Sequence, residues 1–246
     1  MTNNQYFMKK LNILLITLLL INQVTLSFAQ TNNNPTIEKG VLLSSQGKLI
    51  DALVQFQLSE KENGITNELA FYIGNTYFDL INYTKAIEYY SKAIELKPTD
   101  LNSLYNRASS NYQLNKFNEA LTDYTALLSK DGNNENAYYE RGKTHSQLEK
   151  NTEAVKDFQA AIQMNPQFEL AYYDLANSYF KLKKFVDAIV NYDKAIELNS
   201  TNSDYYFNRA ICEYNLGFKE DACADFNNAI DLGDKEVEEY ANELCK

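Results

Sequence analysis

Tryptophan is absent from this 246-residue sequence, and residues that interrupt regular structure are scarce, with only 3 prolines and 8 glycines. Proline and glycine form tight turns and end helices, so their scarcity argues against many short strands joined by hairpins. No sustained alternation of apolar and polar residues occurs either. The pattern therefore favours an all-helical protein.

Positive charge is also in short supply. The chain has 23 Lys and Arg residues against 33 Asp and Glu residues, which gives a formal net charge of −10. Proteins that bind duplex nucleic acid usually present a basic face, and anionic lipids attract basic segments. We therefore expect neither nucleic acid nor a membrane surface as the partner.

Catalytic and metal-binding patterns are missing as well. His145 is the single histidine, and an imidazole without a positioned nucleophile does not form a catalytic triad. The sequence has no glycine-rich phosphate loop, no His-Glu-x-x-His, no Gly-x-Ser-x-Gly and no Cys-x-x-Cys. We expect no enzyme activity, no cofactor and no metal site, and we interpret His145 as a packed residue in or near the core.

The N-terminal segment differs from the rest of the chain. Two lysines follow Met8, an apolar run extends from Ile13 to Ile21, and small residues precede a cleavage point after Ala29. This order is typical of a secretory signal peptide, and the run is short for a membrane span. We expect residues 1–29 to be removed, with Met1 or Met8 as the start; an uncleaved anchor is the disfavoured alternative, so no stable membrane insertion should remain.

Removal of that segment would leave 21 basic and 33 acidic residues, a net charge of −12. The abundance of Asn, Lys, Ile and Tyr is typical of low-GC bacteria. We therefore expect an exported, acidic protein of the bacterial periplasm, with the extracellular space as the alternative.

The remainder of the sequence repeats with a period of 34 residues. One column holds alanine every time, at Ala52, Ala86, Ala120, Ala154, Ala188 and Ala222. Four residues later stands an aromatic residue, at Phe56, Tyr90, Tyr124, Phe158, Tyr192 and Phe226. Twelve residues before each alanine stands a small residue, at Gly40, Gly74, Ala108, Gly142, Ala176 and Ala210. Each period reads as two helices joined by a short polar turn; the small residue lets the helices approach, and the aromatic ring fills the space beside the alanine.

This arrangement resembles the tetratricopeptide repeat (TPR) family, whose unit is a 34-residue helix–turn–helix with small residues and an aromatic residue at these places. The resemblance implies an all-α, right-handed superhelical solenoid. Its units would lie near residues 33–66, 67–100, 101–134, 135–168, 169–202 and 203–236. We expect a polar linker over 30–36, a repeat array over 37–236 and a capping helix over 237–246.

Two positions covary among the six units. Arginine at the seventh position occurs only with aspartate at the twenty-third: Arg107 with Asp123, Arg141 with Asp157, and Arg209 with Asp225. The two positions are level across the expected hairpin, so we predict ion pairs between the helices of one unit. Binding of an anionic ligand by the arginines is the disfavoured alternative.

Three cysteines lie in the last 40 residues. Export favours disulfides, and Cys223 is level with Cys212 across one expected hairpin and with Cys245 across the next. Either pairing is open at this point. We favour Cys223–Cys245, because it would hold a short terminal helix that has little packing of its own.

The family resemblance also implies which first-helix residues face the groove of the superhelix. The fifth positions hold Phe71, Tyr105, Tyr139, Tyr173 and Phe207, and the twelfth positions add Phe78, Tyr112, Phe180 and Tyr214. Asparagines stand between them, at Asn75, Asn106, Asn177 and Asn208. Comparable sites elsewhere are aromatic or acidic, as at Glu140 and Asp174, so the lysine–arginine clamp of chaperone-binding members is not expected.

These residues predict a groove for an extended peptide or a partner helix, since asparagine can donate to and accept from a backbone and the rings supply apolar area. The alternative is that the aromatic ladder packs against neighbouring units. We expect a non-catalytic protein-interaction scaffold of the cell envelope. A glycan-binding module, or a non-catalytic subunit of an envelope enzyme or secretion complex, is the alternative.

Overall fold

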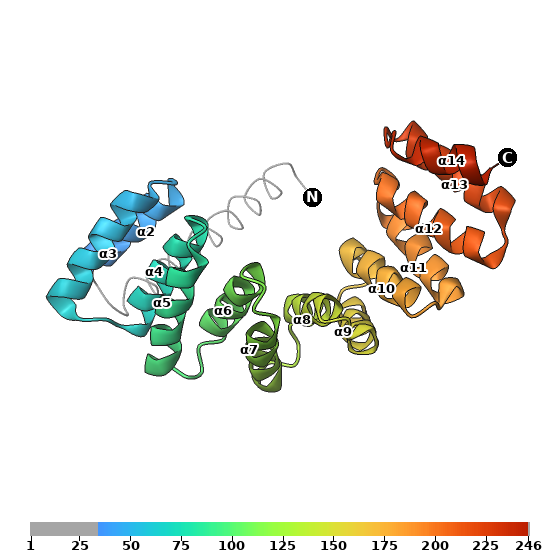
Figure 1. Ribbon diagram of the computed structural model, residues 1–246. Coiled ribbons are helices and arrows are strands. Elements are labelled where there is room, and N and C mark those ends of the chain that lie inside the picture. The colour runs from blue at the N-terminus through green and yellow to red at the C-terminus, as the bar shows by residue number, and fades with distance from the viewer. Residues whose placement is uncertain (1–33, 246) are drawn as a thin grey trace, which may run out of the picture. The chain divides into compact units, whose positions relative to one another are not determined.

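The computed structural model describes residues 34–245, which contain 13 α-helices and no strand (Figure 1). The predicted all-α class is thereby confirmed. The predicted signal peptide, residues 1–29, and residues 30–33 of the predicted linker lie outside the described residues. The chain divides into two compact units, residues 1–65 and 66–246, which are described separately.

The described part of the first unit, residues 34–65, is a single helical hairpin of α2 (Pro35–Ser45) and α3 (Leu49–Asn63). The side chain of Asn34 accepts hydrogen bonds from two backbone amides in the first turn of α2 and donates to Ser59 Oγ at 2.8 Å. This cap starts the helix at Pro35, two residues before the predicted start of the array at residue 37.

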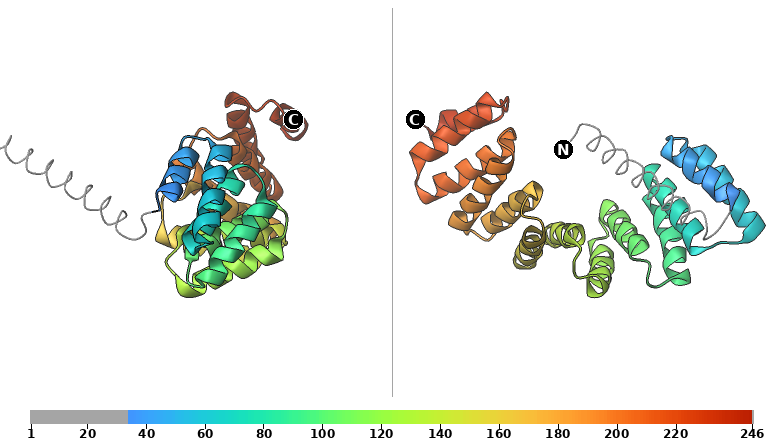
Figure 2. Two further views of the ribbon diagram at one scale, coloured as in Figure 1. Left: turned by 90° about the vertical axis from the view of Figure 1, so that its left-hand side faces the viewer. Right: turned by 180° about the vertical axis from the view of Figure 1, so that it is seen from behind.

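The second unit is a succession of helical hairpins (Figures 1 and 2). Its helices are α4 (Asn67–Asp79), α5 (Tyr83–Leu96), α6 (Leu101–Gln113), α7 (Phe117–Lys130), α8 (Glu135–Gln147), α9 (Asn151–Met164), α10 (Glu169–Lys181), α11 (Phe185–Leu198), α12 (Ser203–Leu216), α13 (Lys219–Asp231) and α14 (Val237–Leu244). Each helix from α5 to α13 packs against the helix before it and the helix after it. In this unit α4, α6, α8, α10 and α12 are the first helices of the repeats.

The columns of the 34-residue period form the core. All six alanines are fully buried, and the six aromatic side chains four residues later are at most 1% exposed. The small residue lies against that ring: a Cβ added to Gly74 would come within 2.6 Å of the Tyr90 ring, and one added to Gly142 within 2.8 Å of the Phe158 ring. The close approach of the two helices therefore depends on a small residue at this column.

The turn inside each hairpin also repeats. Its middle residue has a left-handed backbone with φ between 58° and 85°, at Gly47, Ile81, Asn115, Glu149, Lys183 and Gly217. Glycine adopts this conformation freely and asparagine tolerates it, whereas a β-branched residue is strained there. Ile81, with φ of 59°, is the β-branched member of the set.

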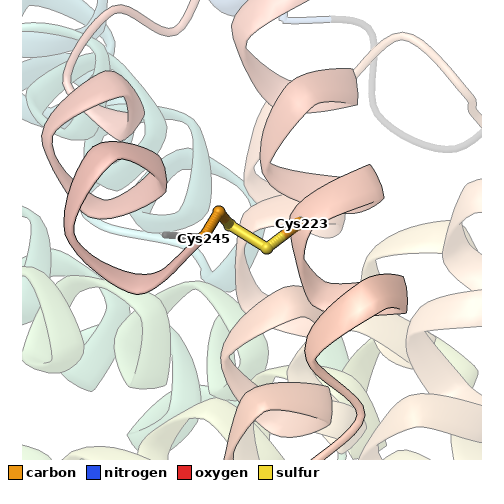
Figure 3. Close-up of a disulfide and its surroundings, with 2 residues drawn as sticks. All are labelled: Cys223 and Cys245. Carbon is orange, nitrogen blue, oxygen red and sulfur yellow. A yellow bond between two sulfur atoms is a disulfide. The ribbon is translucent and has the colours of Figure 1, made fainter.

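The terminal helix α14 covers the end of the second unit. Val237 at its start is buried, and Ala241 and Leu244 pack against the cluster formed by α12 and α13. A disulfide joins Cys223 on α13 to Cys245, with 5.7 Å between their Cα atoms (Figure 3). The third cysteine, Cys212, is buried and free. The favoured pairing is thus the one present, and α14 takes the position predicted for a cap.

Candidate binding groove

The five aromatic residues at the fifth positions share one contact. Each ring lies against the buried core ring 19 residues later, with centroids 5.7–6.2 Å apart. The pairs are Phe71–Tyr90, Tyr105–Tyr124, Tyr139–Phe158, Tyr173–Tyr192 and Phe207–Phe226. These side chains are therefore anchored on the core, and except at Tyr139 they remain half-buried.

Three of them also bridge to the next helices. The Tyr139 ring lies 4.6 Å from that of Phe168, and its hydroxyl donates to Asp174 Oδ2 at 2.9 Å. Tyr139 is only 8% exposed, so the prediction of an accessible groove residue is wrong at this position, where a neighbouring ring covers the side chain. Tyr173 contacts Tyr205 at 4.8 Å and accepts a 3.0 Å hydrogen bond from Asn208.

Phe207 makes the corresponding contact at the end of the array, with its ring centroid 5.2 Å from that of Tyr240 on α14. The packing alternative raised for the aromatic ladder thus accounts for part of the buried surface of these residues. It does not account for the part of each half-buried ring that remains exposed.

The rings at the twelfth positions contact the start of the second helix in their own hairpin. Centroid distances are 5.2 Å for Phe78–Tyr83, 5.3 Å for Tyr112–Phe117 and 5.7 Å for Phe180–Phe185. At Tyr214 the partner is the ammonium of Lys219, 5.9 Å from the ring centroid. All four rings are half-buried, so each keeps some surface for a ligand.

The predicted asparagines are bound to tyrosines. Asn75 Oδ1 accepts from the Tyr90 hydroxyl at 2.8 Å and from Asn106 Nδ2 at 2.9 Å. Asn177 Oδ1 accepts from the Tyr192 hydroxyl at 2.6 Å. A carbonyl oxygen has two lone pairs, so the Asn75 oxygen is fully occupied and its remaining capacity lies in two N–H donors.

Two cavities open beside these side chains. The larger, of about 370 Å³, is called here the central cleft and is lined by Tyr112, Lys143, Ser146, Gln147, Glu149, Asn151, Phe158, Asp174, Asn177, Ser178 and Lys181. The smaller, of about 250 Å³, is lined by Phe71, Leu101, Asn102, Tyr105, Asn106, Leu127, Asp131 and Asn134. Five of the predicted groove residues, Phe71, Tyr105, Asn106, Tyr112 and Asn177, therefore line a cavity.

Lys143 is a lining residue that the sequence analysis missed. Its ammonium lies 5.4 Å from the Tyr112 ring centroid and 5.3 Å from that of Tyr139, and 3.1 Å from Glu140 Oε2. The signal for it was its place at the ninth position of its unit, which Asn75 and Asn177 occupy in theirs. The central cleft thus contains a cation whose position is set by two rings and a carboxylate.

Burial shapes the ionisation of the cleft. It raises the pKa of the Asp174 carboxyl, an effect that the Tyr139 hydroxyl and the Lys143 charge partly offset. Burial also raises the pKa of the Tyr139 phenol, and the adjacent Asp174 adds to the rise, so this hydroxyl stays a hydrogen-bond donor. On α6, burial raises the pKa of Tyr105 to about 12.

The predicted arginine–aspartate pairs are present and lie inside the hairpins. Each guanidinium makes two hydrogen bonds of 2.6–2.8 Å to both oxygens of its aspartate. The pairs are Arg107–Asp123, Arg141–Asp157 and Arg209–Asp225. Arg107 donates in addition to Ser91 and Arg209 to Asp193, both on the preceding hairpin, so these guanidinium groups are engaged by the array itself.

His145 is half-buried beside one of these pairs, with Nε2 3.7 Å from Asp157 Oδ2. Burial lowers its pKa, against the opposing effect of Asp157. Among the described residues no group of three or more His, Cys, Asp or Glu side chains has the arrangement of a metal site. Within the same residues, no helix has the length and apolar character needed to cross a bilayer.

The comparisons with known proteins agree with this geometry. A family model described as "Tetratricopeptide repeat" matches residues 170–202, and one described as "TPR repeat" matches residues 74–114 and 147–183. The chain is a tetratricopeptide repeat protein. No curated protein matches its sequence significantly.

Several solved structures share the fold. MamA is 22% identical, with 68% of this chain and 97% of that chain covered and a TM-score of 0.65. YrrB, described as a TPR protein with an unusual peptide-binding site, is 19% identical, with 77% and 98% covered and a TM-score of 0.69. PilF of Pseudomonas aeruginosa is 16% identical, with 85% and 96% covered and a TM-score of 0.69. At these identities the likeness concerns the fold alone.

Proposed function

We propose that this TPR protein is a non-catalytic scaffold that binds an extended segment or a helix of a protein partner along its first helices. The observation that carries the proposal is the central cleft. Residues of α6, α8, α9 and α10 line it, and they combine the exposed part of an aromatic ring, amides, hydroxyls and charges around one open cavity. Such a mixture suits a peptide, which presents backbone donors and acceptors together with side chains.

In this proposal the half-buried rings supply apolar contacts and the asparagines supply hydrogen bonds. Because the core holds each ring in place, the exposed ring surface meets a ligand with little loss of side-chain freedom. The N–H donors of Asn75 also support peptide binding, since they suit backbone carbonyl groups of an extended ligand. The peptide-binding site named for YrrB supports this use of the fold by analogy.

The proposed place of action is the bacterial cell envelope, with the periplasm favoured. The sequence of residues 8–29 and the Cys223–Cys245 disulfide support it, because disulfides persist in oxidising compartments. N-terminal sequencing of the chain purified from its own cells should begin at Gln30. A chain that retains residues 8–29 and sediments with membranes would contradict export as a cleaved protein.

Capture of partners from a periplasmic fraction tests the binding proposal. Tyr112→Ala and Phe180→Ala should reduce the recovered partner at least about tenfold, as expected when a central aromatic contact is lost. Tyr138→Ala is the matched control, since Tyr138 is also half-buried on a first helix but, unlike Tyr112 and Phe180, does not stand at a predicted groove position. Equal recovery with all three variants, at equal thermal stability, would overturn the groove.

Glycan binding is the second candidate. The exposed surface of Tyr112 beside Asn177 and Asp174 is an arrangement in which a sugar ring would stack and form hydrogen bonds. Retention of the purified chain on insoluble cell-wall polysaccharide, lost in Tyr112→Ala, would favour this candidate over a protein partner.

A further inference from the structure

Asp174 is a partly buried carboxylate in the wall of the central cleft, and the charge of Lys143 acts on it only from beyond ion-pair distance. Its carboxylate accepts a hydrogen bond from the Tyr139 hydroxyl at 2.9 Å, and among the described residues no ammonium or guanidinium lies within 4.0 Å of it. Burial raises the pKa of this carboxyl. A partly desolvated carboxylate without a counter-ion is costly, and a cation placed beside it recovers that cost.

Neither lysine of the cleft forms an ion pair with Asp174. Lys143 is held 3.1 Å from Glu140 and lies between the rings of Tyr112 and Tyr139. Lys181 is on the same helix as Asp174 but seven residues further, which is roughly 10.5 Å along the axis at 1.5 Å per residue. It lies at the far end of the cleft wall and is exposed to solvent.

The positions that the family resemblance places on the groove, which are the second, fifth, sixth, ninth, twelfth and thirteenth of each unit, carry a net negative charge in the second unit. From α4 to α12 these positions hold five acids against two bases: Glu68, Asp79, Glu140, Asp174 and Asp204 against Lys143 and Lys181. The acidic excess lies on α4 and α12, on either side of the cleft, whereas α8 and α10 each carry one acid and one base. Like charges across an interface are unfavourable, whereas an acidic groove attracts and orients a basic segment. A cationic partner is therefore the complementary one.

We propose that the central cleft binds a lysine or arginine side chain of the protein partner, with Asp174 as its counter-ion. The inference rests on the proposed function and names the chemistry of its ligand. A cavity of about 370 Å³ has room for one such side chain. Ser146 and Gln147 line the same cavity from α8 and offer oxygen acceptors to the N–H groups that Asp174 does not reach.

Host–guest peptides test this site directly. The probes are acetylated and amidated nonapeptides, Gly-Ser-Ala-Ala-Xaa-Ala-Ala-Ser-Gly, with Arg, Lys, Gln or Glu as the guest Xaa, and binding is measured with the full mature chain. We expect the Arg and Lys peptides to bind at least about tenfold more tightly than the Gln and Glu peptides. That preference should shrink as ionic strength rises from about 0.01 to 0.15 M, because salt screens the attraction.

The variants locate the preference. Asp174→Asn keeps an oxygen acceptor for Tyr139 and should abolish the advantage of Arg and Lys over Gln. Asp204→Asn removes one charge from another groove-facing position, where the residue is exposed, and should leave the advantage within about twofold of the wild-type value. A preference that survives in Asp174→Asn, or is lost equally in both variants, overturns the assignment to Asp174.

The remaining outcomes separate the two proposals. Equal binding of all four peptides, lost in Tyr112→Ala, would overturn the cation site and leave peptide binding in the groove standing. Tighter binding of the Glu peptide would overturn the cation site in favour of an anion at Lys143. No binding of any peptide, together with no partner captured from the periplasmic fraction, would overturn both proposals.

Discussion

Arg141 on α8 and Asp157 on α9 meet through two parallel hydrogen bonds of 2.8 and 2.6 Å. The aspartate is buried and the arginine largely so, with side chains 6% and 19% exposed. His145 Nε2 lies 3.7 Å from Oδ2 of the same carboxylate. One ion pair thus joins the two helices of a hairpin.

Removing only Arg141 should lower the free energy of unfolding more than replacing both Arg141 and Asp157. Arg141→Leu leaves the Asp157 charge buried without its partner, and we expect a loss of about 3–5 kcal/mol in the free energy of unfolding. The double variant, with Asp157→Leu as well, should recover most of that loss because no unpaired charge remains. Urea titration followed by circular dichroism measures both, and equal losses in the single and double variants would contradict the prediction.

The 34-residue period predicted the helix pairs, the buried columns and the arginine–aspartate pairs, since each depends on spacing within one hairpin. The accessibility of the groove residues depends on neighbours that the period does not predict. Phe168 stands where the other first helices of the second unit have a Thr, Asp or Asn cap. Its ring stacks on Tyr139 instead and covers it.

Lys143 was missed for the opposite reason. Its ninth position faces the groove, but the other repeats of the second unit hold Asn, Ser or Ile there, so no repeated column indicates the lysine. The central cleft could not be predicted from the sequence, because it is lined by residues of α6, α8, α9 and α10 whose side chains differ in length from one repeat to the next. The burial of Asp174 could not be predicted either, because it depends on the contact with Tyr139 of another repeat.

The left-handed backbone at Ile81 predicts that replacing this residue will stabilise the protein. Ile81 has φ of 59° and is 73% exposed, so Ile81→Asn relieves strain and loses little buried surface. We expect a gain of about 1 kcal/mol in unfolding free energy, because the left-handed conformation costs an ordinary residue about 1–2 kcal/mol and asparagine tolerates it. Differential scanning calorimetry measures the change.

Asn115 occupies the same place one repeat later, with φ of 58°. Asn115→Ile should lower stability by a similar amount, and the two variants combined should nearly cancel. Stabilisation by Asn115→Ile would show that side-chain contacts outweigh backbone strain at this turn.

Glu213 on α12 should make stability depend on pH. Only 9% of the residue is exposed, its Oε2 has no hydrogen-bond partner, and Arg209 lies 3.9 Å from Oε1. Burial, with the nearby charges of Asp225, Asp221 and Asp193, raises the pKa of Glu213 from 4.5 to about 7, against the opposing effect of Arg209. A raised folded-state pKa means that the folded chain favours the protonated acid, so stability is lost as pH rises from 4.5 through 7.

Glu213→Gln removes this titration. The variant should be more stable than the wild type by about 1–3 kcal/mol at pH 8, with the difference vanishing near pH 4, where both side chains are neutral. Glu220→Gln on the exposed face of α13 is the control and should change little at either pH. Unfolding free energies that run parallel from pH 4 to 8 would exclude a buried, titrating Glu213.

Reduction of the Cys223–Cys245 disulfide should loosen α14 specifically. The bond closes a chain segment with a sequence separation of 22, for which loop-closure entropy corresponds to about 3 kcal/mol. Because α14 has only eight residues, it cannot remain a stable helix without its packing on α13. Hydrogen exchange in the reduced protein should therefore speed up over Val237–Leu244 and much less over α8 and α9. Uniform acceleration along the chain would mean that the disulfide stabilises the whole array rather than its cap.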